Sequence, residues 1–546
     1  MADENKQKKE LTITIKTPEL VVLGIFCILT LALYLNVTLK SPIVFGDEGF
    51  HTRMAQLIAQ EKNYFIYLPF ESTPLLANTF SRPPLWNLLE AGFFMMLGFS
   101  EILVKFLTPF IAVATGLAVY TLVKRLLDGK IALLSAIVML AVPSFVTYSV
   151  LFYSDIFLSF YMAMFILTFA MASKLNSRKY LALAATFAAL VFLTKTSGLM
   201  VVVFLAMAFL YELLAERKLR ITLKKYSVVM MVFLIIVAGF LIRNIAHYGT
   251  LDCAMPIGII DVATAKCAGI KNYSSSYAFS DRALQTGTEQ TPFSLGIANY
   301  FVFAYGNLWF LVLGSVAGYF LLFWKRDKFI NFILIFAIML PMVFPFVAQR
   351  AEDTARHTLI WVFALSIIAS SFFAEIYGAI RKYNRYVALA VFIIVILLSY
   401  QSLVDKLNGM KSVKQFSPLF LQACDWVEHN LPENATLYSV WDHNAIYNCQ
   451  RNVVAQGSIP DIALSNNVDI IKTAAGKNDI DYIFIQKFSI DTQNRNIASM
   501  YNLDFVSILE NDNTTFTKVY ENGPDVQQCL QQGGCDGSII YRINLA

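Results

Sequence analysis

Two neighbouring acids open the first loop of the chain, in the stretch Gly46-Asp47-Glu48-Gly49-Phe50-His51. They follow an apolar segment of about 20 residues, which is long enough to cross a bilayer as a helix. Because charge is costly inside a membrane, acids at the end of such a segment face water or a functional cavity. Asp47, with Glu48 beside it, is therefore a candidate general base; the alternative is a solvated loop that caps the next helix. His51, one helical turn after Asp47, could tune that carboxylate or simply face water.

Other polar side chains collect near the ends of later apolar segments, on one side of the membrane by the topology given below. Arg and Lys can bind phosphate, and an acid can position a hydroxyl group. This combination suits a lipid-linked phosphate at the membrane surface. For each residue the alternative is a solvated cap or a side chain that extends to the interface. The set consists of Asp47, Glu48, Arg82, Asp155, Lys195, Arg243 and Arg356.

The composition is that of a polytopic membrane protein with a soluble part. Of the 546 residues, 57% are hydrophobic and 15% are charged, whereas soluble proteins carry about 25% charged residues. The net charge of +5 is small, and no nucleic-acid partner is expected. Residues 1–16 are polar and Lys-rich, and the apolar segment after them lacks a clear cleavage site, so no removable signal peptide is predicted.

The charges of the short loops orient the spans. Lysines precede the first span, which predicts a cytoplasmic N-terminus. The apolar piece 84–99 is short and contains Asn87 and Glu90, so it is predicted to be interfacial or re-entrant; the later Lys- and Arg-rich loops then all lie inside. Within the first loop, Phe50 to Ile58 has the spacing of an amphipathic helix on the membrane surface. About 11 spans result, at roughly 19–39, 101–123, 131–152, 156–173, 180–195, 198–215, 226–243, 295–323, 329–348, 357–380 and 386–404.

Residues 405–546 are predicted to form a separate extracytoplasmic α/β domain, after a transmembrane domain at 1–404. Strand-like runs are Thr436–Val440, Asp481–Gln486, Phe505–Leu509, Thr515–Tyr520 and Ser538–Ile543. Helical runs are Pro418–Asn430, Val468–Ala475 and Asn494–Met500.

The seven cysteines are unevenly placed. Cys27 lies in the first span as an inert core thiol, and the other six fall outside, which suggests disulfides in an oxidising compartment. Proximity in the chain favours the pairs Cys253–Cys267, Cys424–Cys449 and Cys529–Cys535. A zinc site is disfavoured because no CxxC spacing occurs. Sequons at Asn272, Asn434 and Asn513 also fall outside.

Five motifs in order resemble those of the GT-C glycosyltransferases, most closely the protein O-mannosyltransferase and aminoarabinose transferase family. They are Gly-Asp-Glu at 46–48, Arg-Pro-Pro-Leu-Trp at 82–86, Tyr-Ser-Asp at 153–155, Leu-Thr-Lys-Thr-Ser-Gly-Leu at 193–199 and Leu-Ile-Arg-Asn at 241–244. The resemblance covers roughly residues 19–250 and implies a polyprenyl- or dolichyl-phosphate sugar donor, bound at the outer face of the membrane.

The resemblance also implies roles for single residues. Asp47 matches the presumed catalytic base and Glu48 its neighbour. Arg82 is expected near the donor phosphate, and Asp155 matches the acid of the second loop. The Arg356-His357 pair is similar to a basic pair in some members. The aminoarabinose transferases have a Glu where this chain has Ser81, so no metal ligand is carried over, and a divalent metal is left open.

These observations predict an integral-membrane glycosyltransferase that moves a hexose or pentose, with inversion, to a protein, lipid or glycan acceptor. A prokaryotic plasma membrane is the expected location. The alternative is a transporter or flippase of a lipid-linked or anionic substrate, which predicts charges at mid-depth and similar halves; the spans are nearly free of such charges. An oligosaccharyltransferase-like enzyme would carry a Trp-Trp-Asp signature, whereas here Val440 precedes Trp441-Asp442.

Overall fold

A computed structural model describes residues 17–40, 46–62, 83–248, 305–325, 328–347, 355–410, 417–440, 442–455, 459–463, 465–491, 501–531 and 535–545. Its contacts divide the chain into two compact units. The helical unit comprises Met1–Lys40, Ile102–Gly239 and Thr291–Val413, and the sheet unit comprises Ser41–Glu101, Phe240–Gln290 and Lys414–Ala546. The first loop is thus grouped with the C-terminal residues, and the last helix of the helical unit continues beyond the predicted boundary at residue 404.

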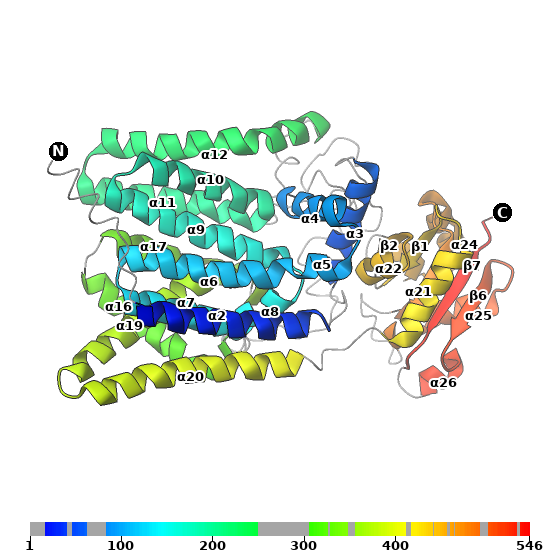
Figure 1. Cartoon of the computed structure of the whole chain (residues 1–546). Helices are drawn as coiled ribbons and strands as arrows, with labels where there is room; N and C mark the ends of the chain where they lie inside the picture. Colours follow the sequence, from blue (N-terminus) through cyan, green and yellow to red (C-terminus); the bar gives the residue numbers. More distant parts are fainter. Residues whose placement is uncertain are drawn as a thin grey trace. The chain divides into compact units, whose positions relative to one another are not determined.

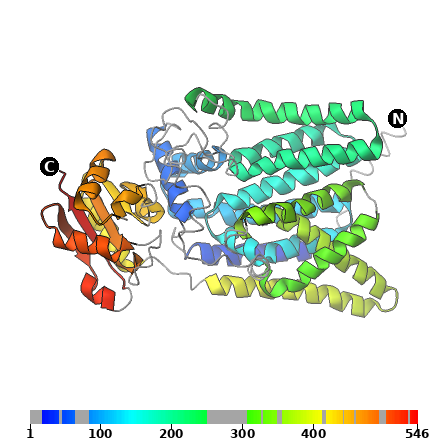
Figure 2. The same ribbon diagram turned by 180° about the vertical axis from the view of Figure 1, so that it is seen from behind.

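The helical unit consists of long apolar helices that run side by side (Figures 1 and 2). Seven helical segments of the described chain are long and apolar enough to cross a membrane, or up to eight if one bent pair counts as a span. The helices are α2 (Thr17–Thr38), α5 (Glu101–Lys105), α6 (Leu107–Leu126), α7 (Gly129–Ala141), α8 (Pro143–Val150), α9 (Ser154–Leu175), α10 (Arg178–Thr194), α11 (Met200–Glu216), α12 (Leu219–Tyr248), α16 (Trp309–Lys325), α17 (Lys328–Val347), α19 (Val362–Arg381) and α20 (Arg385–Met410). The predicted spans overlap these helices where the structure describes them, but the predicted count of about 11 spans is not confirmed.

The bent pair is α7 and α8, whose axes differ by 62°. Pro143 begins α8 and lacks a backbone N–H, so the helix cannot continue unbroken through the turn. Backbone carbonyls near the break must find other donors inside a membrane. Side chains of α2 and α20 provide them: Tyr34 Oη donates to the Leu140 carbonyl at 2.6 Å, and Ser402 Oγ to the Ala141 carbonyl at 3.5 Å. The two neighbouring helices therefore stabilise the broken span.

Two glycines bring α16 close to α19. A Cβ added at Gly318 would lie 2.3 Å from the backbone oxygen of Ile368, and one added at Gly314 would lie 3.0 Å from the Phe373 ring. Small residues four positions apart allow helices in a membrane to approach closely. The α16–α19 contact therefore depends on the absence of a side chain at Gly318.

Gly318→Ala is expected to destabilise the protein by about 1–3 kcal/mol, the range for overpacking a close contact. Thermal unfolding of the purified protein in detergent checks this. Gly239→Ala on α12 is the matched control, because a Cβ there would meet no atom within 4 Å. Equal unfolding midpoints for the two variants would contradict the expectation.

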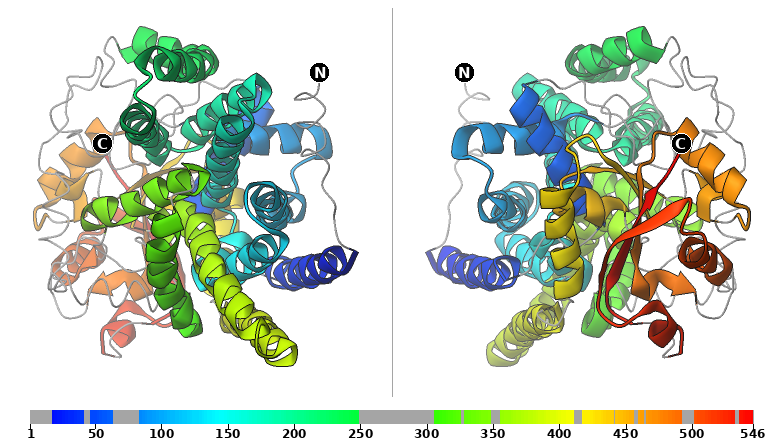
Figure 3. Two further views of the ribbon diagram at one scale, coloured as in Figure 1. Left: turned by 90° about the vertical axis from the view of Figure 1, so that its left-hand side faces the viewer. Right: turned by 90° about the vertical axis from the view of Figure 1, so that its right-hand side faces the viewer.

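The sheet unit contains a five-stranded mixed sheet in the order β2-β1-β3-β7-β6 (Figures 1 and 3). β1 pairs in parallel with β2 and β3, while β7 is antiparallel to β3 and β6. The strands are β1 (Thr436–Ser439), β2 (Asn452–Ala455), β3 (Tyr482–Gln486), β6 (Phe516–Asn522) and β7 (Ser538–Ile543), and β4 (Ile490–Asp491) pairs separately with β5 (Tyr501–Asn502). The helices are α3 (Gly46–Glu61), α4 (Leu85–Leu97), α21 (Pro418–Asn430), α22 (Asp442–Asn448), α23 (Pro460–Ala463), α24 (Val468–Lys477), α25 (Leu503–Asn511) and α26 (Val526–Gln531).

The predicted α/β character of the C-terminal residues is confirmed, with one wrong element. Phe505–Leu509 was predicted as a strand but lies in α25. A short apolar run does not distinguish a strand from a buried helix, and here Phe505, Val506 and Leu509 share the buried face of a helix. The predicted helix Asn494–Met500 lies outside the described residues.

The first-loop helix exists as α3, but its apolar side is covered by protein. Phe50, Met54 and Ile58 are buried, and α3 packs against α4 and α22. The prediction that this apolar face rests on the membrane surface is therefore wrong. α4 has 13 residues and a length of about 20 Å, too short to cross a hydrocarbon core of about 30 Å.

Two of the three predicted disulfides are confirmed, Cys424–Cys449 and Cys529–Cys535. Cys27 is a free, buried thiol. The Cys253–Cys267 pair lies outside the described residues. Cys424–Cys449 joins α21 to the end of α22, across 25 residues of sequence that include β1.

Cys449→Ser is expected to lower the stability of the sheet unit by roughly 3 kcal/mol, because the crosslink no longer restricts the unfolded chain. Urea unfolding followed by tryptophan fluorescence, to which Trp426 on α21 contributes, measures this. Cys27→Ser, which breaks no disulfide, serves as the control. A midpoint that is the same with and without reducing agent in the wild type would contradict a stabilising crosslink.

Candidate functional site

Three of the predicted site residues meet in the helical unit. Asp155 Oδ1 accepts a hydrogen bond from Lys195 Nζ at 2.7 Å, and Asp155 Oδ2 accepts one from Arg356 Nε at 2.9 Å. The side chain of Asp155 is only 2% exposed, while those of Lys195 and Arg356 are 19% and 17% exposed. Residues 40 and 201 positions away from Asp155 are therefore joined at one buried carboxylate. We refer to Asp155, Lys195 and Arg356 as the charged triad.

Local structure holds each member of the triad. Asp155 lies in the first turn of α9, where the helix dipole stabilises an acid. Lys195 has extended backbone between α10 and the 3₁₀ turn η1 (Thr196–Leu199). That turn requires Gly198, since a Cβ there would lie 2.5 Å from the Val191 carbonyl oxygen. The sequence motif around Lys195 thus breaks the helix and directs a lysine to the end of α9.

Arg356, the third member of the triad, lies in the segment before the 3₁₀ turn η4 (Leu359–Trp361). Its guanidinium lies over the ring of Tyr153, 4.4 Å from the centroid, as in a cation–π contact. Ser159 Oγ on α9 donates to the Leu359 carbonyl at 3.4 Å and ties the two segments together. His357 is half-buried beside Arg356.

The triad carries a surplus positive charge, because two cations meet one carboxylate. A lysine ammonium has three N–H donors and a guanidinium has five, so each can bond Asp155 and a further acceptor at once. Buried cations of this kind bind phosphate and carboxylate groups through charge-assisted hydrogen bonds. The triad is therefore a candidate anion site.

The sheet unit carries a second polar group, between α3 and α4. Glu48, in the first turn of α3, is buried. One turn later, the ring nitrogen Nδ1 of His51 lies 2.7 Å from Asn87 Oδ1 on α4. Glu90, one turn after Asn87, is fully buried, and its carboxyl oxygens accept no hydrogen bond from the described residues. Burial raises the pKa of Glu90 well above its usual range.

Residues of the C-terminal part of the chain contact α3. Arg53 on α3 donates to the side-chain oxygen of Gln450, just after α22. Tyr447 on α22 donates to Glu101 Oε2 at 3.2 Å. Burial and then the nearby Glu101 raise the pKa of Tyr447. α22 begins at Asp442, so the segment that follows β1 packs on the helix that carries Asp47 and Glu48.

The remaining predicted residues are placed less fully. Asp47 lies in the first turn of α3, but its side chain, like the whole of Arg82, is outside the described residues. Arg243 lies near the end of α12, with its guanidinium 5.2 Å from the centroid of the Phe240 ring. The sequence argument did not assign a role to Tyr153, Asn87 or Glu90, although the polarity of Asn87 and Glu90 in an apolar helix was a signal. In the described part of the chain, no group of three or more His, Cys, Asp or Glu side chains is arranged to hold a metal ion.

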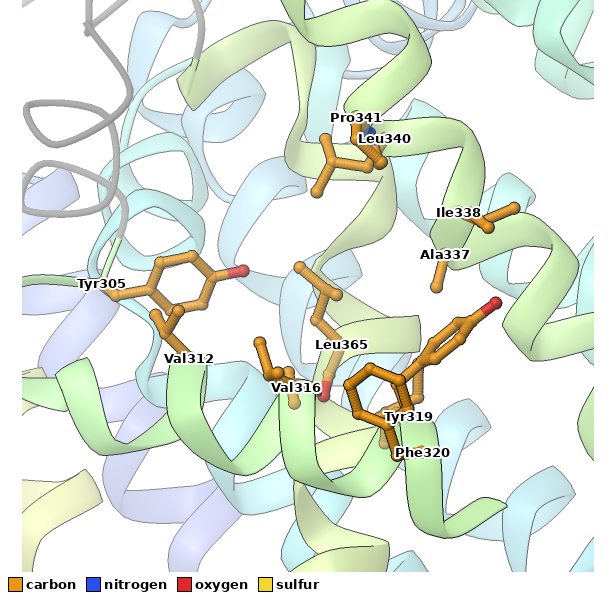
Figure 4. A pocket seen from close by; sticks show the side chains of 12 residues that line it. Tyr305, Val312, Val316, Tyr319, Phe320, Ala337, Ile338, Leu340, Pro341 and Leu365 are labelled. Atoms are coloured by element: carbon orange, nitrogen blue, oxygen red, sulfur yellow. Dashed lines mark hydrogen bonds between the residues drawn. The ribbon is translucent and has the colours of Figure 1, made fainter. Parts of the chain in front are cut away.

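An apolar cavity of about 300 Å³ lies among α16, α17 and α19. In Figure 4 the rings of Tyr305 and Tyr319 stand on either side of Val316 and Leu365. Its lining is almost entirely hydrocarbon, and it belongs to helices of the membrane-embedded unit. Such a cavity can accept an alkyl or isoprenoid chain.

The chain was compared with protein families, curated proteins and solved structures. Residues 81–242 match the family described as dolichyl-phosphate-mannose-protein mannosyltransferase. No curated protein sequence matches the chain.

Solved structures resemble the chain over most of its length. The oligosaccharyltransferase AglB from Archaeoglobus fulgidus, in complex with an inhibitory peptide and a dolichol-phosphate, has a TM-score of 0.64 at 16% identity, covering 87% of this chain and 70% of that one. ArnT from Cupriavidus metallidurans, bound to undecaprenyl phosphate, has a TM-score of 0.60 at 12% identity, covering 96% and 98%. Arabinofuranosyltransferase AftD from Mycobacteria has a TM-score of 0.55 at 12% identity, covering 95% and 40%. The chain is a multi-pass membrane protein with a C-terminal α/β domain and the fold of the GT-C glycosyltransferases.

Proposed function

We propose that this protein is a membrane glycosyltransferase that moves a sugar from a polyprenyl- or dolichyl-phosphate donor to an acceptor at the extracytoplasmic face. The charged triad is the observation that carries the proposal. A buried aspartate that holds a lysine and an arginine side by side offers a preorganised site for one phosphate group. The similarity to proteins whose structures hold dolichol-phosphate or undecaprenyl phosphate supports the same donor class.

In the proposed reaction, Asp47 acts as the general base. Its carboxylate removes the proton of the acceptor hydroxyl while the hydroxyl oxygen attacks the anomeric carbon. The bond from that carbon to the donor phosphate breaks, and its electron pair leaves with the phosphate. A single displacement inverts the anomeric configuration. Glu48 supports Asp47, and no nucleotide is needed because the lipid carrier brings an activated sugar.

The leaving phosphate requires positive charge. Lys195 and Arg356 provide it in this proposal, with Arg82, Arg243 and His357 as further donor-binding residues. Cations that stabilise a developing phosphate charge are among the largest contributors to transferase catalysis. Asp155 then acts as the anchor that holds the two cations in place, since it is nearly inaccessible itself.

The lipid part of the donor needs an apolar surface within the membrane. The cavity bounded by Tyr305, Tyr319 and Leu365 supports this requirement, because it is lined by hydrocarbon and belongs to the same unit as the triad. An isoprenoid chain in that cavity would remain in contact with the bilayer while its phosphate is bound by protein.

The disulfides of the C-terminal residues support an extracytoplasmic location for 405–546, because such bonds persist in oxidising compartments. Together with the positive-inside loops, this supports a cytoplasmic N-terminus. A prokaryotic plasma membrane is the location that we propose. The transmembrane domain at 1–404 would then bring the donor, and the acceptor would be a protein, lipid or glycan.

The test is consumption of radiolabelled polyprenyl-phosphate sugars, of several sugars and chain lengths, by the purified protein with and without candidate acceptors. Release of polyprenyl phosphate together with a labelled acceptor supports the transferase. Reconstitution of the same protein into liposomes examines the alternative function in parallel. Donor that crosses the liposome membrane unchanged, with no sugar released, would replace the transferase with a flippase.

A further inference from the structure

The histidine that follows the acid pair is held in a defined orientation. His51 Nδ1 lies 2.7 Å from Asn87 Oδ1, and the amide nitrogen of the same Asn87 lies 2.8 Å from Met54 Sδ. His51 also stacks edge to face with Phe50, at 5.2 Å between ring centroids. Asn87 and Met54 are buried. The imidazole is thus fixed by contacts from both α3 and α4.

These contacts also determine which ring nitrogen carries the proton. A thioether sulfur only accepts hydrogen bonds, so the Asn87 side chain must direct its NH₂ group to Met54. Its oxygen then faces His51, and an oxygen accepts. His51 Nδ1 is therefore the protonated nitrogen, and in the neutral ring Nε2 carries the lone pair. Asn87 sets the tautomer of His51.

The helical spacing relates this ring to the acid pair. Positions 47 and 51 are four apart on α3 and lie on one face of it, one turn from each other. Glu48 and Thr52 are related in the same way, and Thr52 Oγ1 donates to the Glu48 carbonyl at 2.8 Å. Position 51 therefore lies one turn after the proposed base on α3, and its side chain contacts Asn87 of α4.

We propose that His51, in the tautomer set by Asn87, accepts the proton that the acceptor hydroxyl has given to the Asp47-Glu48 pair. This inference rests on the proposed function. The protonated carboxyl of Asp47 transfers its proton to the Nε2 lone pair, which gives an ionised carboxylate and an imidazolium. The imidazolium then releases a proton to water, and both groups return to their starting states. His51 acts through the acid pair and not on the sugar.

The groups around His51 are compatible with this role. The titratable side chain that α4 brings to α3 is Glu90, and α22 brings Tyr447, with Glu101 hydrogen-bonded to it. Burial raises the pKa values of Glu90 and Tyr447, which favours the neutral form of both side chains. On α3 itself the other titratable neighbours are Glu48 and Arg53, and Arg53 donates to Gln450. Asp442 and His443 of α22 have side chains outside the described residues.

The first test is His51→Ala with chemical rescue. Turnover of the lipid-linked donor is expected to fall by about 10- to 100-fold, below the full effect of a lost general base. Added imidazole should restore a large part of it, because a free base can then take the proton. His51→Gln, which can bond Asn87 but cannot accept a proton, should be as slow as His51→Ala and keeps the test valid if the alanine variant misfolds. His429→Ala, at an exposed histidine on α21, is the control and should match the wild type.

The second test uses the pH profile. In Asn87→Asp a carboxylate faces the Nδ1–H group and favours the imidazolium, so it raises the pKa of His51. A His51 that must start neutral loses activity as the pH falls through that pKa. The acid limb of the rate profile should therefore move to higher pH by about one unit or more.

The outcomes separate the inference from the function on which it rests. A wild type that turns over donor, with His51→Ala and His51→Gln at half its rate or more, or with no imidazole rescue and an unmoved acid limb in Asn87→Asp, overturns the inference and leaves the transferase standing. A wild type that consumes no donor overturns both.

Discussion

Lys195→Met is expected to reduce the affinity for the lipid-linked donor by about 10- to 100-fold, since a charge-assisted hydrogen bond contributes roughly 1.5–3 kcal/mol. The physical reason is the surplus charge of the triad. With Lys195 removed, Arg356 alone neutralises Asp155, and the triad itself no longer carries a net positive charge for the phosphate. The measurement is the KM for donor, together with direct binding of the unglycosylated polyprenyl phosphate.

The single variant has a second effect, because it leaves a buried carboxylate with one partner. Loss of one member of a buried ion pair costs about 3–5 kcal/mol of stability. The double variant Lys195→Met/Asp155→Asn separates the two effects, since it removes one charge of each sign. It should regain thermal stability but not donor affinity. If donor affinity returned with stability, the triad would be structural and the phosphate site would have to lie elsewhere.

The chain offers a closely matched control in the same unit. Lys225 Nζ bonds Glu212 Oε1 at 2.6 Å, and the two side chains are 19% and 3% exposed, nearly the values of Lys195 and Asp155. Lys225 also lies 4.6 Å from the centroid of the Phe169 ring. Lys225→Met therefore perturbs an equivalent ion pair outside the proposed site. It should lower stability as Lys195→Met does and leave the KM for donor unchanged.

The membrane-embedded part of the fold could be predicted from the sequence because its signals are local. A run of apolar residues indicates a span without knowledge of its neighbours. The orientation that the loop charges predict stays a prediction. The disulfide pairs Cys424–Cys449 and Cys529–Cys535 followed from proximity, since the residues between them are few. The broken span α7–α8 was predicted as one continuous segment at 131–152, because the bend at Pro143 depends on donors from α2 and α20.

The candidate site, too, could be predicted from the sequence only in part. The members of the triad could be grouped from the sequence, since each polar residue falls at the end of a span on one side. Their pairing could not, because it depends on how α9 meets the turn after α10 and the segment before η4. The bond between His51 and Asn87 likewise depends on the packing of α3 against α4. The strand predicted at Phe505–Leu509 was wrong for a related reason. A five-residue apolar run is too short to distinguish a strand from a buried helix until its packing partners are known.

Asp47→Asn is expected to lower the turnover number for sugar transfer by about 10²- to 10⁴-fold, the usual contribution of a general base. An amide occupies the same volume as the carboxylate but cannot take the proton of the acceptor hydroxyl. Because the proposed phosphate site is formed by other residues, the KM for donor should change little. A loss of the turnover number at constant KM identifies an interaction made only in the transition state.

Glu61→Gln, near the other end of α3, is the control for a lost negative charge on the same helix, and it should retain full activity. Glu48→Gln should give an intermediate loss, since Glu48 is buried beside the base. A folded Asp47→Asn variant with full activity would remove Asp47 from the mechanism. The base would then have to be Glu48 or Asp155, and Asp155 is a poor candidate because both of its oxygens already accept hydrogen bonds from cations. That outcome would leave Glu48 as the acid to test, and it would move the proton acceptor one position along α3, to the face that carries Thr52.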